Sequence, residues 1–151
     1  MQACILKFLW HITPALTTVV LGAFAAHWFF VRNGNAGAFV DALVRELEGL
    51  RADSLEYWNA APSSQNNEGR MTMLEQKIKG SIKSISSDAG HFCRKYKKGM
   101  RAEIERLMSN LSDSATGGEF ESKKRKADSG RYILIVNSIN EVRSCLLKTK
   151  L

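Results

Sequence analysis

Two cysteines in the C-terminal half come nearest to forming a chemical site. Cys93 and Cys145 lie in segments expected to form antiparallel helices about a Gly117-Gly118 turn, at roughly equal distances along the two helices. A disulfide would require Cα atoms within about 7 Å and would indicate an oxidising, periplasmic or extracellular location. Two buried thiols acting as small hydrophobic residues are the alternative, and the sequence leaves both open.

Catalytic and metal-binding patterns are weak in this chain. His91 beside Cys93 suggests a metal ligand, but no second ligand cluster or CxxC spacing supports it. The sequence has three His, no convincing acid–base pair, and no G-x-S-x-G, H-E-x-x-H, P-loop or dinucleotide fingerprint. We therefore expect no enzymatic activity, no metal and no cofactor.

Basic residues form two clusters in a chain whose net charge is +7 and whose pI is about 9.5. This balance suits an anionic partner. The first cluster is expected on the exposed face of a helix, and the second lies between the acidic Glu119, Glu121 and Asp128. Possible contacts with an anionic surface are therefore Arg94, Lys95, Lys97, Lys98, Arg101, Lys123, Lys124, Arg125 and Lys126.

The second cluster is better explained as a solvated linker, because Asp128-Ser129 offers an N-cap where the apolar period of the last helix begins. Weak contact with anionic lipid or nucleic acid is the alternative. Nucleic acid is the less favoured partner, since the chain lacks aromatics interleaved for base stacking and a helix-turn-helix signature.

The N-terminal segment, which would fix the location of the rest of the chain, carries no charged residue. Residues 8–31 contain no Lys, Arg, Asp or Glu, and a bilayer core of roughly 30 Å needs about 20 apolar residues. Aromatic residues lie at both ends, as suits the two membrane interfaces. The segment predicts a single transmembrane helix, with interface residues Trp10, Trp28, Phe29, Phe30 and Arg32.

A cleaved signal peptide and a buried core helix are the alternatives for this segment. Lys7 and the A-x-A-like Ala23-Phe24-Ala25 would fit a signal peptide, although apolar residues continue beyond that site. A buried core helix should have one polar side, and this segment is apolar nearly all round. Basic residues flanking the segment leave its orientation nearly undetermined.

The sequence that follows the N-terminal segment predicts an all-α fold. After a flexible exit at residues 32–37, we expect helices at about 38–60, 70–86, 92–110 and 129–148, with an uncertain break at 86–90. Their apolar stripes are Leu43, Leu47, Leu50 and Trp58, with Leu55 alongside; Met71, Leu74, Ile78, Ile82 and Ile85; Phe92, Tyr96, Met100, Ile104, Leu107 and Leu111; and Ile135, Ile139, Val142 and Leu146. Such stripes predict an antiparallel bundle of three to four helices.

Two details of this bundle are open to test. The acidic first helix could lie beside the basic third helix, with little gain from surface ion pairs. The aromatics of Leu55–Ala60, "LEYWNA", could line a small ligand site, although packing against the neighbouring loop is favoured.

The domain organisation is an N-terminal anchor at residues 1–32 and a soluble helical bundle at residues 33–151. We expect a membrane-anchored interaction or scaffold protein of a bacterial envelope, whose partners are the lipid bilayer through residues 8–31 and a protein or a second copy. An extracytoplasmic four-helix sensory module acting through a partner is the alternative, and a membrane-tethered nucleic-acid binder is a weaker one. The expected location is the bacterial inner membrane, with the bundle periplasmic if Cys93 and Cys145 are bridged.

Overall fold

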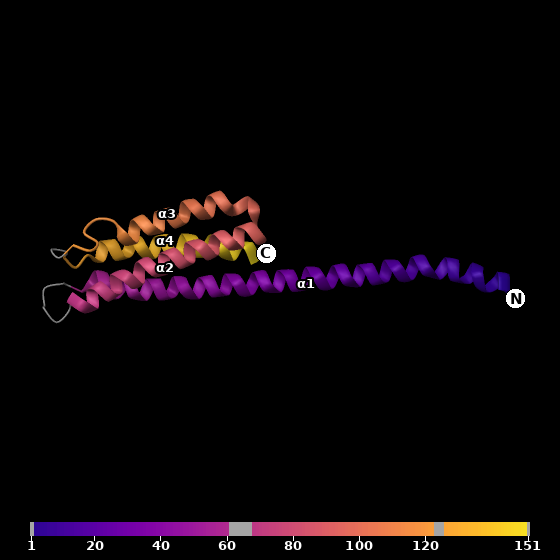
Figure 1. Cartoon of the computed structure of the whole chain (residues 1–151). Helices are drawn as coiled ribbons and strands as arrows, with labels where there is room; N and C mark the ends of the chain where they lie inside the picture. The colour runs from indigo at the N-terminus through magenta and orange to yellow at the C-terminus, as the bar shows by residue number, and fades with distance from the viewer. Residues whose placement is uncertain (1, 61–67, 123–125, 151) are drawn as a thin grey trace. The chain divides into compact units, whose positions relative to one another are not determined.

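The structure is a computed structural model that describes residues 2–60, 68–122 and 126–150; the side chains of residues 2–20, 29, 30, 32, 33 and 150 are not among those described. The regular structure of the described residues is entirely helical (Figure 1). Its elements are α1 (Gln2–Asn59), α2 (Glu68–Lys95), the 3₁₀ turn η2 (Lys98–Met100), α3 (Arg101–Thr116), α4 (Ser129–Leu147) and the 3₁₀ turn η3 (Lys148–Lys150). The predicted all-α class and helical bundle are confirmed.

The chain divides into two compact units, Met1–Gly37 and Ala38–Leu151. The sequence-based boundary was between residues 32 and 33. The flexible exit expected at residues 32–37 was wrong, because these residues are helical and belong to α1. Gly and Asn cost up to about 1 kcal/mol each in a helix, but propagating a helix through a few poor residues avoids the cost of nucleating a new one.

The second unit is a four-helix bundle in which consecutive helices are antiparallel neighbours. α1 contacts α2, where Lys77 Nζ lies 2.6 Å from Asp53 Oδ1, and α2 packs on α3. α3 contacts α4 through the Ser114 and Ser138 hydroxyls, 3.0 Å apart. α4 returns to α1, with Arg143 Nη1 3.2 Å from Glu48 Oε1. This ring of contacts places α1 and α3 diagonally.

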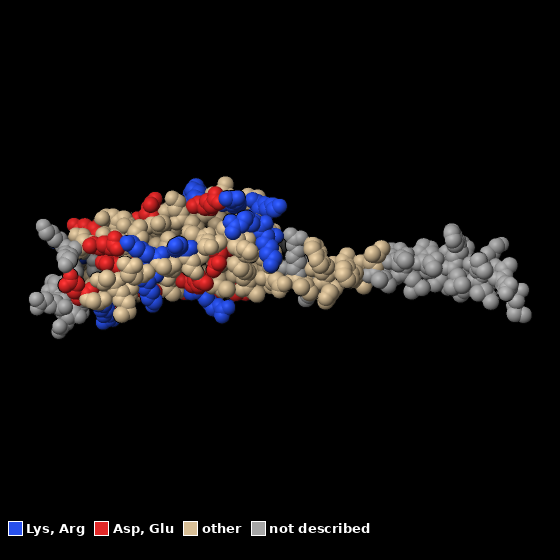
Figure 2. Space-filling model, in the orientation of Figure 1, with Lys and Arg blue, Asp and Glu red and all other residues tan. Residues whose placement is uncertain are grey.

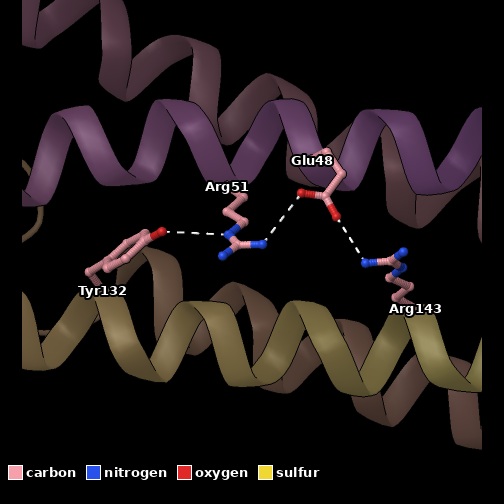
Figure 3. A network of polar contacts seen from close by, with 4 residues as sticks. All are labelled: Glu48, Arg51, Tyr132 and Arg143. Atoms are coloured by element: carbon pink, nitrogen blue, oxygen red, sulfur yellow. Dashed lines mark hydrogen bonds and ion pairs between the residues drawn. The ribbon is translucent and has the colours of Figure 1, made fainter.

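The expectation that the acidic first helix lies beside the basic third helix is therefore wrong. The carboxylates of α1 pair with α2 and α4 instead. Figure 3 shows the α4 side, where Glu48 lies between Arg51 and Arg143, and the hydroxyl of Tyr132 accepts a hydrogen bond from Arg51 Nε at 3.5 Å. These charged side chains are 41–44% exposed, so each pair contributes only about 0–1 kcal/mol.

The core consists of the predicted apolar stripes with small corrections. Except for Leu55, which is 40% exposed, every predicted stripe residue of α1, α2 and α4 is buried. Buried with them are Val40, Tyr57, Ala89, Cys93, Met108, Ala115 and Cys145. Tyr96 and Met100 are only half-buried, because the chain turns between α2 and α3 at that point. Burial of each large apolar side chain contributes about 1.5–3 kcal/mol, which makes this core the main source of stability.

Helix α2 continues through the break considered at residues 86–90. Ala89 is fully buried and falls between Ile85 and Phe92, so the apolar spacing stays at three and four residues through the polar stretch. The real break comes later, where Lys97 leaves the helix with φ −140° and ψ 61°. The bundle thus has four helices, but the second is longer and the third starts later than expected.

The connection between α3 and α4 folds over two aromatic residues at the end of α1. The ring of Phe120 lies 5.0 Å from that of Tyr57, and the Arg131 guanidinium lies 5.7 Å from the ring centre of Trp58. The backbone N–H of Glu121 donates to the Tyr57 hydroxyl at 3.0 Å, and that of Asp128 donates to the Trp58 carbonyl at 2.9 Å. Tyr57 and Trp58 are almost completely buried, which confirms packing as their role.

The predicted N-cap of the last helix is confirmed. Asp128 has an extended backbone, and its Oδ1 accepts a hydrogen bond from the Arg131 N–H at 2.9 Å. The Gly-Gly turn has a steric cause. A Cβ at Gly117 would lie 2.5 Å from the Asp113 carbonyl oxygen and 2.6 Å from Arg131 Nη2, and Gly118 has a φ of +67°.

Continuity of α2 can be tested at Ser87. Because Pro lacks the N–H and clashes with the preceding turn, Ser87→Pro should lower the free energy of unfolding by about 3 kcal/mol. Ser87→Ala at the same exposed position is the control and should be neutral or slightly stabilising. Urea denaturation followed by circular dichroism measures both. Equal stability of the two variants would show a helix break at this point.

The same Gly→Ala change should have opposite effects at two positions. Gly117→Ala should destabilise the bundle by about 1–3 kcal/mol, because its Cβ has no room. Gly80→Ala should stabilise it by up to about 1 kcal/mol, because Gly80 is an exposed residue of α2 with nothing within 4 Å of its Cβ position. Thermal unfolding of the two variants provides the comparison, and a destabilised Gly80→Ala would contradict it.

Candidate anionic-surface site

Five basic residues meet where α2 ends and α3 begins. We call residues 94–101 the basic turn; they are Arg94 and Lys95 in α2, Lys97 and Lys98 in the turn, and Arg101 at the start of α3. The sequence analysis placed these residues on one face of a helix, which was wrong because the chain reverses here. Figure 2 shows Lys and Arg side chains gathered at one end of the bundle. These residues therefore form a positively charged end of the bundle and not a stripe along one helix.

The turn has a regular local structure. The N–H of Tyr96 donates to the Phe92 carbonyl at 2.8 Å, and the N–H of Met100 donates to the Lys97 carbonyl at 3.0 Å. Basic residues in the last turn of α2 also oppose the partial negative charge of the helix C-terminus. The fold thus tolerates several cations close together at this end.

Most of this positive charge is not neutralised within the protein. Arg101 pairs with Glu105, with Nε 2.7 Å from Oε1, and this hydrogen bond raises the pKa of Arg101. Among the described residues, no carboxylate forms an ion pair with Arg94, Lys95, Lys97 or Lys98. Lys95 instead has its Nζ 5.2 Å from the centre of the Tyr96 ring.

The sequence analysis missed further residues at this end. Lys148 of η3 and Arg106 of α3 line one hollow of about 480 Å³, which also contains Glu103 and Glu141, so basic and acidic residues are equal in number there. Phe39 of α1 stacks on the rings of His91 and Phe92 at 6.1 and 5.9 Å. A basic residue in the last turn of the final helix was the available signal for Lys148. The Phe39 contact depended on tertiary structure.

Lys126, the described residue of the second basic cluster, does not join the basic turn. Lys126 is exposed and precedes α4, whereas the basic turn precedes α3; the two antiparallel helices begin at opposite ends of the bundle. Lys123, Lys124 and Arg125 lie outside the described residues. One flat anionic surface at the end of the bundle would therefore not reach both Lys126 and the basic turn.

The expected membrane-interface residues are described only in part. Trp28 is exposed, as are its apolar neighbours Leu21, Phe24 and Val31. The side chains of Trp10, Phe29, Phe30 and Arg32 lie outside the described residues. Within the described part of the chain, no helix is both long and apolar enough to span a membrane.

A groove between α2 and α3 adjoins the basic turn. It has a volume of about 470 Å³ and is bordered by Arg94, Arg101 and the hydroxyls of Ser86 and Ser109, with Glu105 among its acidic residues. Because its charges are mixed, it does not favour one class of small ligand. Cys93 lies in its wall.

The two cysteines are both buried, free thiols in the structure, with exposed fractions of 0% for Cys93 and 4% for Cys145. Both lie in the C-terminal turns of their helices, at the end of the bundle that carries the basic turn. Burial raises the pKa of each thiol, and nearby Glu105 and Glu103 add to the effect for Cys93 and Cys145 respectively. Raised pKa values keep the thiols protonated and poorly nucleophilic near neutral pH.

Metal binding finds no geometric support in the residues that the structure describes. No group of three or more His, Cys, Asp or Glu side chains there could hold a metal ion. His91, considered as a ligand beside Cys93, is exposed and stacks on Phe39.

The thiols should make the bundle less stable at alkaline pH. Because each folded-state pKa is raised, the folded chain retains protons that the unfolded chain loses above about pH 8.5. Their contribution is therefore complete below that pH and is lost as pH rises through the folded pKa. A Cys93→Ala, Cys145→Ala double variant should lose less stability between about pH 8 and 10 than the wild type.

Urea denaturation with a reducing agent at each pH measures this difference. Other alkaline groups are common to both chains and cancel in the comparison. Parallel pH profiles would show that the thiols do not titrate differently on unfolding. In the native state, both thiols should also react with a maleimide far more slowly than in urea.

Three features bear on the function of the chain: the basic turn, the buried thiols beside it, and the uncharged segment 8–31. Comparison with protein-family models, curated proteins and solved structures found no match for this chain.

Proposed function

We propose that the chain is a non-enzymatic, membrane-anchored helical interaction or scaffold protein of a bacterial envelope. The observation that carries the proposal is the absence of charge from residues 8–31. Leu21, Phe24, Trp28 and Val31 in this segment are 69%, 71%, 58% and 46% exposed. Exposed apolar side chains of this size favour transfer from water to hydrocarbon, which a single-pass anchor in the inner membrane would provide.

The bundle supports the interaction part of the proposal. Residues 38–151 form a separate compact unit with its own core of four helices. Its exposed large apolar side chains lie on α1, α2 and α4; they are Leu55, Met73, Ile133, Leu134 and Leu147. Such a domain presents a mainly polar surface to a protein partner or a second copy, while the anchor fixes its place at the bilayer.

The redox state of the two thiols bears on the side of the membrane on which the bundle lies. Free Cys93 and Cys145 fit a reducing compartment, and a bridge between them would fit the periplasm. A reporter fused to the C-terminus, read together with thiol labelling in urea, assigns the side. Labelled thiols together with a periplasmic reporter would show that both cysteines stay reduced in the periplasm, so that their redox state does not indicate the location.

Charge placed within residues 8–31 should release the chain from membranes. Arg at the centre of a spanning helix costs about 2.5–3.5 kcal/mol per residue, so Leu21→Arg, Phe24→Arg should move the chain from the alkali-washed membrane pellet to the supernatant. Met73→Arg, Ile133→Arg on the bundle surface is the matched control and should stay in the pellet.

Either of two outcomes would contradict the anchor. One is extraction of the wild-type chain from membranes by alkaline carbonate, and the other is an intact mass that shows cleavage after Ala25. The second outcome would establish a cleaved signal peptide instead. Cross-linking and purification of the wild-type chain from the same membranes then tests for a protein partner or self-association.

A sensory module is the second candidate, favoured by a hollow of about 480 Å³ beside Trp58 and Arg131. The Arg131 guanidinium at this hollow suits a small ligand that carries a carboxylate. Screening of small carboxylates by thermal shift tests this role. A ligand whose stabilisation disappears in Arg131→Gln would support it, and no shift at millimolar concentrations would exclude ligands of this class from the hollow.

A further inference from the structure

We infer that the basic turn is a membrane-surface contact, which binds anionic phospholipid headgroups and holds one end of the bundle against the bilayer. This inference rests on the proposed anchor. The basic turn would add a second attachment to the bilayer, besides the anchor. The residues that form it are Arg94, Lys95, Lys97 and Lys98.

The length of the connecting chain limits how far this end of the bundle can lie from the proposed membrane segment. Phe39, at the start of the bundle part of α1, stacks on Phe92, two residues before Arg94. About seven residues join Val31 to Ala38, which allows a separation of about 10 Å if helical and at most about 25 Å if extended. The opposite end of the bundle, which bears Trp58 and Lys126, is separated from the basic turn by the length of the helices.

Charge distribution also favours this end. Residues 94–101 contain five basic residues and no acidic one, and only Arg101 has a carboxylate partner there. Toward the other end, Lys77 and Lys79 pair with Asp53 and Glu121, and the exposed Lys126 follows a stretch that contains the acidic Glu119 and Glu121 and precedes Asp128. The acidic residues on elements near the basic turn are Glu103, Glu105 and Asp41. None of them forms an ion pair with Arg94, Lys95, Lys97 or Lys98 among the described residues, so these four are the expected lipid contacts.

The chemistry of the turn suits a lipid surface better than a nucleic acid. Lys and Arg at an anionic bilayer each favour binding by about fivefold, and the attraction acts over a Debye length of about 8 Å. Single-stranded nucleic acid would need aromatic rings exposed for base stacking. Tyr96, the one aromatic residue within the turn, is half-buried and packs on Phe92 at 5.5 Å.

A reporter at Gly99 tests the contact in the full chain. A Cβ at Gly99 would meet nothing within 4 Å, so Gly99→Cys in a Cys4→Ser, Cys93→Ala, Cys145→Ala background can carry an environment-sensitive fluorophore. The chain is reconstituted into vesicles of phosphatidylcholine alone or with phosphatidylglycerol. We expect a blue shift only in the vesicles with phosphatidylglycerol, and its loss at high salt.

Two charge-matched variants locate the contact. Arg94→Gln, Lys95→Gln, Lys97→Gln, Lys98→Gln should abolish the blue shift, with about a fivefold loss in the bound-to-free ratio per residue. Lys123→Gln, Lys124→Gln, Arg125→Gln, Lys126→Gln removes the same charge near the start of α4 and should keep it. If the first variant melts early, Lys95→Gln, Lys98→Gln at two exposed positions replaces it, with a partial loss expected.

The outcomes separate this inference from the proposed anchor. No blue shift, an equal loss in both variants, or a shift produced by duplex DNA and not by phosphatidylglycerol would overturn the lipid contact. Flotation of the chain with neutral vesicles reports the anchor alone. Flotation without a blue shift would overturn only the contact, whereas salt-sensitive flotation restricted to anionic vesicles would overturn only the anchor.

Discussion

Burial of the apolar stripe of α2 is the constraint from which the form of the bundle follows. The stripe runs from Met71 to Phe92 without interruption, because Ala89 occupies the position that would otherwise be polar. A small residue is enough at that position, since what matters is that no polar group has to lose its water. The helix therefore continues to Lys95, and the reversal of the chain falls within the most basic stretch of the sequence.

The two ends of the bundle have different physical characters as a result. One end is closed by aromatic packing, backbone hydrogen bonds and an N-cap around Tyr57, Trp58 and Asp128. The other end turns tightly and leaves its cations exposed to solvent. Repulsion among cations is a modest cost at a solvated end of a bundle whose stability comes from its core. An anionic surface would relieve that repulsion.

The proposed function combines two observations that both point to a membrane surface. An uncharged segment suggests attachment to a bilayer, and a cation-rich bundle end near the same part of the chain suggests orientation on it. Neither assignment needs a catalytic group, and the buried, protonated thiols between the helices fit a structural role. Attachment at two points would limit the directions in which the remaining surface can meet a partner.

The sequence by itself determined the helical class, nearly all of the core and the Asp128 cap, because helical spacing and capping depend on residues close together in the chain. Tertiary structure decided where α2 ends, since burial of Ala89 depends on the neighbouring helices. It also decided that α1 pairs with α2 and α4, that Phe39 reaches Phe92, and that Lys126 lies apart from the basic turn. These are contacts between distant segments, and no local pattern specifies which helices become neighbours.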